Sequence, residues 1–92
     1  MNDIAIRHDT QRQRFDTEVE GHVAHLEYRL KGDVLVITHT EVPESIGGRG
    51  IAGKLVRTAV EYARDAGLKV APVCSYSAEW MERHPEYAGL RA

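Results

Sequence analysis

The residues best suited to chemistry lie in one stretch, 42–54, which reads VPESIGGRGIAGK. It contains four glycines, which let a backbone turn tightly and approach a ligand closely because they have no Cβ: Gly47, Gly48, Gly50 and Gly53. Arg49, Lys54 and Arg57 add positive charge, and the apolar periodicity that follows predicts a helix, whose first N–H groups attract anions. The stretch therefore predicts an anion-binding loop, with phosphate as the natural ligand.

Two phosphate-binding patterns can be matched to this loop. Gly48–Lys54 fits G-x-x-x-x-G-K, the body of a nucleotide-triphosphate loop, but Leu55 stands where Ser or Thr would hold magnesium. That pattern also needs several parallel strands, whereas the chain after the loop offers only one more strand. The alternative takes residues 49–52 as a pyrophosphate-binding turn without a metal, because several backbone N–H groups can converge on one anion. The second pattern fits the sequence better.

The second pattern resembles the pyrophosphate loop of the GCN5-related N-acetyltransferases, Q/R-x-x-G-x-G/A, at residues 47–52. Gly47 stands where that family usually has Gln or Arg, while Gly50 and Ala52 keep the core of the pattern. The flanks resemble a short, single-domain subgroup of the family in four segments that follow in the same order: RFDTE at 14–18, LEY at 26–28, HTEVP at 39–43 and PVCSY at 72–76.

The hydrophobic pattern predicts how the loop is held. Residues 4–8 are a possible first strand, 12–19 follow, and 22–30 alternate apolar with polar residues, as a half-buried strand does. A turn at 31–33 leads into a strand over 34–42, so these two strands should form an antiparallel hairpin. Its four consecutive apolar residues, 34–37, predict a strand that is covered on both faces.

From Ile51 the apolar period changes to that of a helix, which should end at Gly67. The strand predicted over 69–74 must return to the sheet, which makes a right-handed β-α-β crossover, and Pro72 indicates an edge position. A short helix over 78–84, capped by Ser77, should follow. We therefore expect an α+β fold with a mixed sheet, similar to a minimal GCN5-related acetyltransferase.

Composition limits the classes of function. Ninety-two residues, 42% of them hydrophobic, suffice for one domain, which we expect to span residues 1–92. A formal net charge of −2 argues against a chain that coats nucleic acid. The sequence has no apolar run long enough for a membrane helix and no apolar leader. We expect a cytoplasmic protein with neither nucleic acid nor membrane as partner.

Cysteine and histidine usage limits the redox and metal chemistry. Cys74 is the single cysteine, so an internal disulfide is excluded, and its thiol serves either packing or chemistry. Among the five histidines, His22 and His25 have no third ligand close to them along the chain. The sequence therefore predicts no metal site.

The resemblance implies coenzyme A or acetyl-CoA as cofactor. In the family the pantetheine arm lies in a V-shaped gap between two splayed parallel strands, here those ending at Val42 and Cys74. The main chain of Glu41 and Val42 would pair with the pantetheine amides. The pyrophosphate would be held by the loop residues Gly48, Arg49, Gly50, Ile51, Ala52, Gly53 and Lys54.

The catalytic candidates implied by the resemblance are Cys74, His39 and Tyr76. Direct transfer needs a base to take a proton from the amine, for which His39 or Glu41 is suited, and an acid for the leaving thiolate, for which Tyr76 is suited. Cys74 could be an acyl-accepting nucleophile, a residue that lines the site, or core packing. The other three candidates also have a purely structural alternative: His39 as a core histidine, Glu41 as a solvated strand end, and Tyr76 as a lid over the core.

In the family that the sequence resembles, helices near the N-terminus build the acceptor pocket, and no segment before Ile51 has a helical pattern here. The resemblance therefore implies an open acceptor side. That favours a protein tail or a polyamine as amine acceptor, or a homo-oligomer or partner subunit that completes the site. The leading hypothesis is an acetyl-CoA-dependent N-acetyltransferase. The alternatives are a coenzyme A-binding module without turnover and a degenerate nucleotide triphosphatase.

Overall fold

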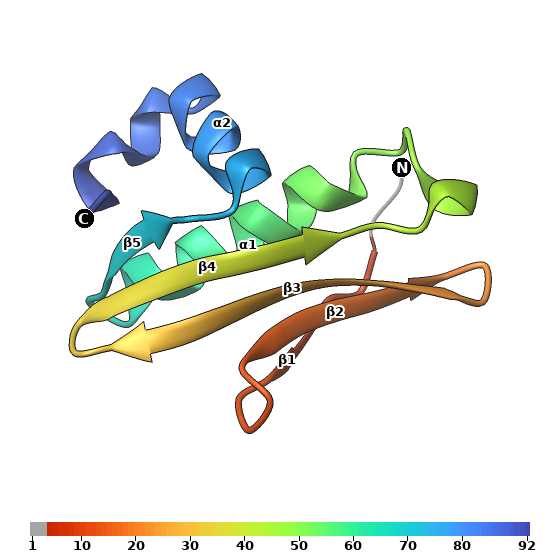
Figure 1. Ribbon diagram of the computed structural model, residues 1–92, viewed down its shortest axis with the longest axis horizontal. Helices are drawn as coiled ribbons and strands as arrows, with labels where there is room; N and C mark the ends of the chain where they lie inside the picture. The colour runs from red at the N-terminus through yellow and green to blue at the C-terminus, as the bar shows by residue number, and fades with distance from the viewer. Residues whose placement is uncertain (1–3) are drawn as a thin grey trace.

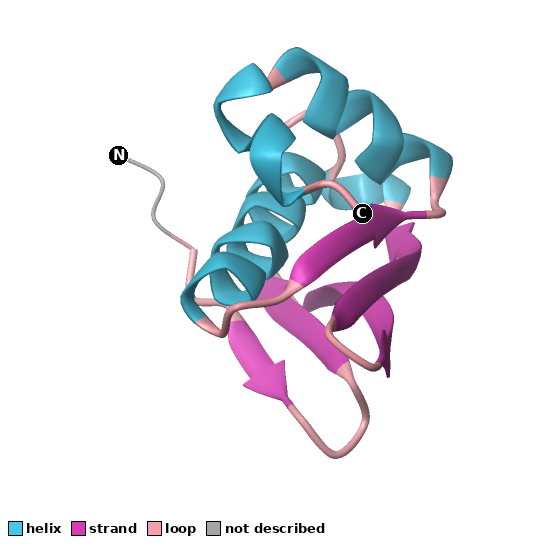
Figure 2. Ribbon diagram, turned by 90° about the vertical axis from the view of Figure 1, so that its left-hand side faces the viewer, coloured by secondary structure: helices cyan, strands magenta, loops and turns pink. Residues whose placement is uncertain are grey.

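The computed structural model describes residues 4–92; residues 1–3, with which the expected domain begins, lie outside the described part. A five-stranded sheet in the order β1-β2-β3-β4-β5 carries its helices on one side (Figure 1, Figure 2). The first three strand pairs are antiparallel and β4–β5 is parallel. The elements are β1 (Arg7–Asp9), β2 (Arg14–Val19), β3 (His22–Lys31), β4 (Val34–Glu41), η1 (Glu44–Ile46), α1 (Ile51–Asp65), β5 (Lys69–Pro72), α2 (Ser75–Arg83) and η2 (Pro85–Leu90).

The β4-α1-β5 unit confirms the expected crossover and the α+β class. The helix α1 ends where the sequence predicts, because Gly67 takes a left-handed φ of 75° and the Leu68 N–H donates to the carbonyl of Ala63 at 2.8 Å. The strand β5 then lies at the edge of the sheet beside β4, and Pro72 is its last residue. Proline has no N–H to donate, but on the outer side of an edge strand no neighbouring strand needs that hydrogen bond.

Within residues 4–92, only one face of the sheet is covered. On β3 the side chains of Ala24, Leu26 and Tyr28 are buried, whereas Val23, just before them, and Glu27, between Leu26 and Tyr28, are exposed. The buried set packs against the apolar stripe of α1, which includes Leu55, Val56, Ala59, Val60 and Ala63. Figure 2 shows the helices gathered on that side. The core therefore lies between the sheet and the helices, and the other face is open.

The open face corrects one expectation for β4. Its run 34–37 predicted cover on both sides, and β4 is indeed an interior strand between β3 and β5. Leu35 and Ile37 are fully buried beneath the helices, but Val34 and Val36 are only half-buried. The apolar run matches an interior position in the sheet, while the second covering layer is absent from the described residues.

The last helix begins earlier than predicted. The helix α2 starts at Ser75 with Cys74 as its N-cap residue, so Ser77 lies in the first turn and is not the cap. Its buried hydroxyl donates to the carbonyl of Cys74 at 2.7 Å. The helix ends before Pro85, as expected, and the 3-10 helix η2 follows. Within the described residues no helix is long and apolar enough to cross a membrane.

Candidate functional site

The parallel strands β4 and β5 part at the carboxyl end of β5. Their pairing runs from Val34↔Lys69 to Ile37↔Pro72, after which the N–H groups of Val73 and Cys74 both donate to the carbonyl of Ile37, at 3.1 and 3.0 Å. The chain then turns into α2, while β4 continues to Glu41 paired with β3 (Figure 1). The edge of residues 38–41 that looks away from β3 thus has no strand beside it in the described structure.

A β-bulge at Thr38 sets the direction of the side chains at this edge. Tyr28 pairs with Ile37, but the next residue of β3, Glu27, pairs with His39, so Thr38 is an additional residue. One extra residue reverses the faces of all that follow it. His39 therefore lies opposite exposed Glu27 on the open face, whereas Thr40 lies opposite Leu26 on the helix side.

Cys74 lies next to Thr40 where the strands part. The thiol Sγ is 3.7 Å from Thr40 Oγ1, and the half-buried side chain packs against the hydrophobic core. Burial raises the pKa of the Cys74 thiol, but hydrogen bonds involving the Ser77 N–H, the Thr40 hydroxyl and the Tyr76 N–H outweigh it and lower the pKa below its ordinary value. Sequence reasoning missed Thr40, although it stands in the HTEVP segment between two residues that it did select.

The glycine-rich turn joins β4 to α1 as predicted. Buried Ile46 of η1 anchors the turn, and Gly48 and Gly50 have left-handed φ angles of 77° and 75°. Gly50 is the N-cap of α1, and no side-chain hydrogen bond caps this helix within residues 4–92. The Lys54 N–H donates to the Gly50 carbonyl at 3.1 Å. The N–H groups of residues 51–53 come before this first helical bond and have no acceptor within the helix, so they are the donors that an anion would meet.

The arginines near this turn are each held by another part of the fold. Arg49 donates to both carboxylate oxygens of Glu20, in the β2–β3 turn, at 2.9 and 3.1 Å. Arg57 donates to the Tyr87 hydroxyl of η2 at 2.9 Å and lies 5.4 Å from the centroid of the Trp80 ring. A hollow beside the first turns of α1 is lined by Ile4, Ile6, Lys54, Arg57 and Thr58.

Tyr76 lies against the start of α1. A Cβ built on Gly53 would be 3.3 Å from the Tyr76 hydroxyl oxygen and 3.5 Å from Trp80 Nε1. Glycine at position 53 therefore lets α2 approach the first turn of α1 closely. Tyr76 is 38% exposed, and its hydroxyl lies at the first turn of α1, beside the glycine-rich turn.

His39 and Glu41 lie on the face away from the helices. His39 Nε2 is 3.2 Å from Glu41 Oε1, and both side chains are exposed. Sequence reasoning grouped His39 with Cys74 and Tyr76 as the catalytic set and named Glu41 as the alternative base. The structure divides the set, because Cys74 with Thr40 lies on the core side of β4 and the His39–Glu41 pair on its open side.

Strands that part beside the glycine-rich start of a helix match the class of acyltransferase that the loop pattern indicates. The family model of the GCN5-related N-acetyl-transferase matches residues 14–90. The chain belongs to the GCN5-related N-acetyltransferase family. Membership supports acyl transfer as the general class of reaction.

The chain is also similar to individual proteins over most of its length. It is 34% identical to Protein NATD1 of Mus musculus over 85 residues, which cover 89% of this chain and 77% of that protein. Protein NATD1 of Homo sapiens is 33% identical, with 89% and 75% covered. The NMR solution structure of a GCN5-like protein from Staphylococcus aureus superposes with a TM-score of 0.78 and 27% identity, covering 100% of this chain and 91% of that one. The likeness confirms the fold.

Proposed function

We propose that the protein is an acetyl-CoA-dependent N-acetyltransferase that acts on an amine acceptor. The observation that carries the proposal is that β4 and β5 part next to the start of α1, where no side chain within residues 4–92 caps the first N–H groups. This arrangement offers an unpaired strand edge for an amide-containing arm and a group of N–H donors for a phosphate. Coenzyme A, the cofactor that the family resemblance implies, contains both groups: the amides of its pantetheine arm and a pyrophosphate.

The residues present fit coenzyme A. The left-handed φ angles of Gly48 and Gly50 keep the turn free of side chains, so that a pyrophosphate can approach the N–H groups of Ile51, Ala52 and Gly53. Arg49 and Lys54 would add charge at either side of that position. The main chain of Glu41 and Val42, beyond the end of β5, would pair with the pantetheine amides.

When bound, acetyl-CoA would supply the activated acetyl thioester. The amine attacks only when it is unprotonated, so His39 or Glu41 on the open face would accept its proton. Tyr76 would donate a proton to the departing sulfur. Cys74, whose thiolate is favoured by its hydrogen bonds, would line the end of the path or accept the acetyl group before the amine does.

The open face of the sheet supports a large or flexible acceptor. The described residues ahead of α1 form strands and the 3-10 helix η1, so no long helix builds a closed pocket over His39 and Glu41. A protein tail or a polyamine would reach these side chains directly. A second copy of the chain or a partner subunit could also complete the acceptor side.

Thermal unfolding with coenzyme A, acetyl-CoA and Mg-ATP side by side tests the cofactor. Coenzyme A should raise the unfolding free energy without metal, by about 2.7 kcal/mol at a free concentration 100-fold above Kd. Protection by Mg-ATP alone would instead favour the nucleotide triphosphatase, and no protection by millimolar coenzyme A contradicts the proposal. Acetyl transfer to a panel of amines then tests turnover.

A second candidate is a coenzyme A-binding module without turnover. The separation of Cys74 from the His39–Glu41 pair by the strand β4 favours it, because these candidate residues do not place the thiol and the base on one face of the sheet. This candidate predicts the same protection by coenzyme A but no acetylated product with any amine of the panel. The transfer assay therefore separates the two.

A further inference from the structure

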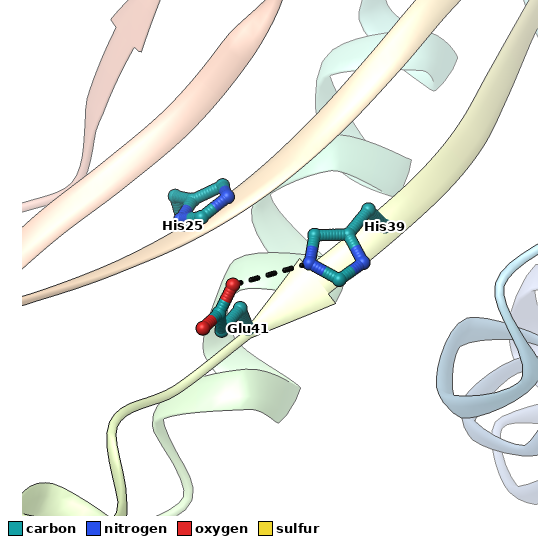
Figure 3. Close-up of side chains that lie close together, drawn as sticks. All are labelled: His25, His39 and Glu41. Carbon is teal, nitrogen blue, oxygen red and sulfur yellow. Dashed lines mark hydrogen bonds and ion pairs between the residues drawn. The ribbon is translucent and has the colours of Figure 1, made fainter.

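Three side chains that commonly bind metal ions meet on the open face of the sheet (Figure 3). His25 comes from β3, and His39 and Glu41 come from β4. One ligand atom from each of the three lies within 4.8 Å of the others. The two imidazole rings lie diagonally across the strand pair, with centroids 5.7 Å apart and ring planes tilted by 52°.

The register of β3 and β4 brings these residues together. His25 lies directly opposite Glu41, and Glu27 directly opposite His39. Without the bulge at Thr38, the alternation of β4 would turn His39 and Glu41 toward the helices, away from His25. The bulge therefore assembles the cluster. The sequence argument against a metal compared ligands only along the chain, where these partners are far apart.

The donor set and spacing suit a zinc-class ion. Two imidazoles and one carboxylate are characteristic of zinc sites that keep one position open, with metal–ligand distances of about 2.0–2.2 Å. Tetrahedral geometry at those distances places ligand atoms about 3.4 Å apart. The present separations need side-chain movements of about an ångström, which exposed His39 and Glu41 can make by rotation.

Neighbouring carboxylates favour a cation here and support the ligands. Glu27 Oε2 lies 3.0 Å from His25 Nε2, and Glu41 Oε1 lies 3.2 Å from His39 Nε2. A carboxylate bound to one ring nitrogen orients the imidazole and leaves the other nitrogen for the ion; Glu27 can do this for His25, whereas Glu41 is itself one of the ligands. His25 is the more buried of the two histidines, with 17% of its side chain exposed against 53% for His39, so it provides the fixed part of the cluster.

We propose that His25, His39 and Glu41 form a binding site for a divalent zinc-class ion, with one coordination position open to solvent and Glu27 as the residue that positions His25. The site depends on the strand pairing and not on coenzyme A binding. The zinc titration can therefore succeed or fail whatever the coenzyme A titration gives, but a bound ion would occupy His39 and Glu41, the two candidate bases of the proposed transfer.

Calorimetric titration of Zn²⁺ into the tag-free protein tests the site, with Co²⁺ absorption as a second readout of coordination. One ion should bind per chain, and His25→Ala, His39→Ala and Glu41→Gln should each weaken binding by more than about tenfold. Glu27→Gln should weaken it by about tenfold. Unfolding of the metal-free variants must match the parent, which shows that the loss lies in the site.

Two controls sharpen this experiment. His22→Ala removes an exposed histidine that lies on β3, the strand of His25, but outside the cluster. Cys74→Ser removes the thiol. Both should leave the affinity for Zn²⁺ unchanged. The proposal is overturned by no uptake at millimolar Zn²⁺, by unchanged affinity in His39→Ala, or by equal losses in His22→Ala and His39→Ala.

Discussion

The guanidinium of Arg49 donates to both oxygens of the Glu20 carboxylate, which ties the glycine-rich turn to the turn between β2 and β3, 29 residues away. The hydrogen bonds and charge of Arg49 lower the pKa of Glu20, and those of Glu20 raise the pKa of Arg49. Both groups are exposed, so the pair adds little to stability. Its consequence concerns binding, because the pyrophosphate of coenzyme A would compete with Glu20 for Arg49.

Glu20→Gln should therefore strengthen coenzyme A binding several-fold, since the neutral amide competes less well for the guanidinium. Calorimetric Kd values for coenzyme A at low salt measure the effect. The matched control is Glu18→Gln, which removes the same charge from an exposed position of β2. Equal affinities in the two variants would show that Arg49 does not contact the phosphates.

Gly50→Ala should lose about 1–2 kcal/mol of unfolding free energy, because the φ of 75° at the N-cap of α1 is unfavourable for any residue with a Cβ. Gly67→Ala provides a control with the same φ of 75° at the other end of the helix. Both variants should lose similar stability in chemical denaturation, but only Gly50→Ala should weaken coenzyme A binding. Weakened binding in both would assign the effect to helix strain in general.

The sequence patterns predicted most of the helices and strands correctly because the start and end of these elements are set by residues within them or next to them. The change of period at Ile51, the stop at Gly67 and the edge position of Pro72 were all readable without knowledge of neighbours. The site was less predictable, since it depends on pairing between strands. The bulge at Thr38 follows from how β3 and β4 pack, and it alone decides which face His39 occupies.

The α2 start illustrates the same limit on a smaller scale. Ser77 has the right chemistry for an N-cap, yet its hydroxyl is buried and bonds the Cys74 carbonyl within the first turn. Cys74, an unusual N-cap residue, takes that place because the strand end at Pro72 leaves its backbone extended. Capping preference is a local signal, and here the path of the chain from β5 to α2 overrides it.

Thr40→Val should raise the pKa of Cys74, because the valine keeps the shape of threonine but removes a hydroxyl that favours the thiolate. A higher pKa leaves less thiolate near neutral pH, so alkylation by iodoacetamide should slow and its pH midpoint should move upward. The control is Thr38→Val, because the Thr38 hydroxyl donates to the carbonyl of Glu27 and not to Cys74. An unmoved midpoint in Thr40→Val would mean that the backbone N–H groups of Ser77 and Tyr76 hold the thiolate without its help.

Tyr76→Phe should separate the two roles of the tyrosine at the start of α1. The ring keeps its packing when the hydroxyl is removed, so the unfolding free energy should change little at this partly exposed position. If Tyr76 protonates the leaving thiolate of the proposed reaction, kcat should fall by about 100-fold while the Kd for coenzyme A stays the same. Steady-state transfer rates and calorimetry measure the two quantities.

Tyr87→Phe is the matched control for this change. Its hydroxyl accepts a bond from Arg57 and donates to Glu61 at 2.6 Å, away from the parted strands, so its loss should lower stability without a specific effect on kcat. A parallel fall of kcat in both variants would point to a general loosening of α1 against the C-terminal helices. A weaker Kd with unchanged kcat in Tyr76→Phe would instead assign the hydroxyl to phosphate binding, because it lies beside Gly53 in the first turn of α1.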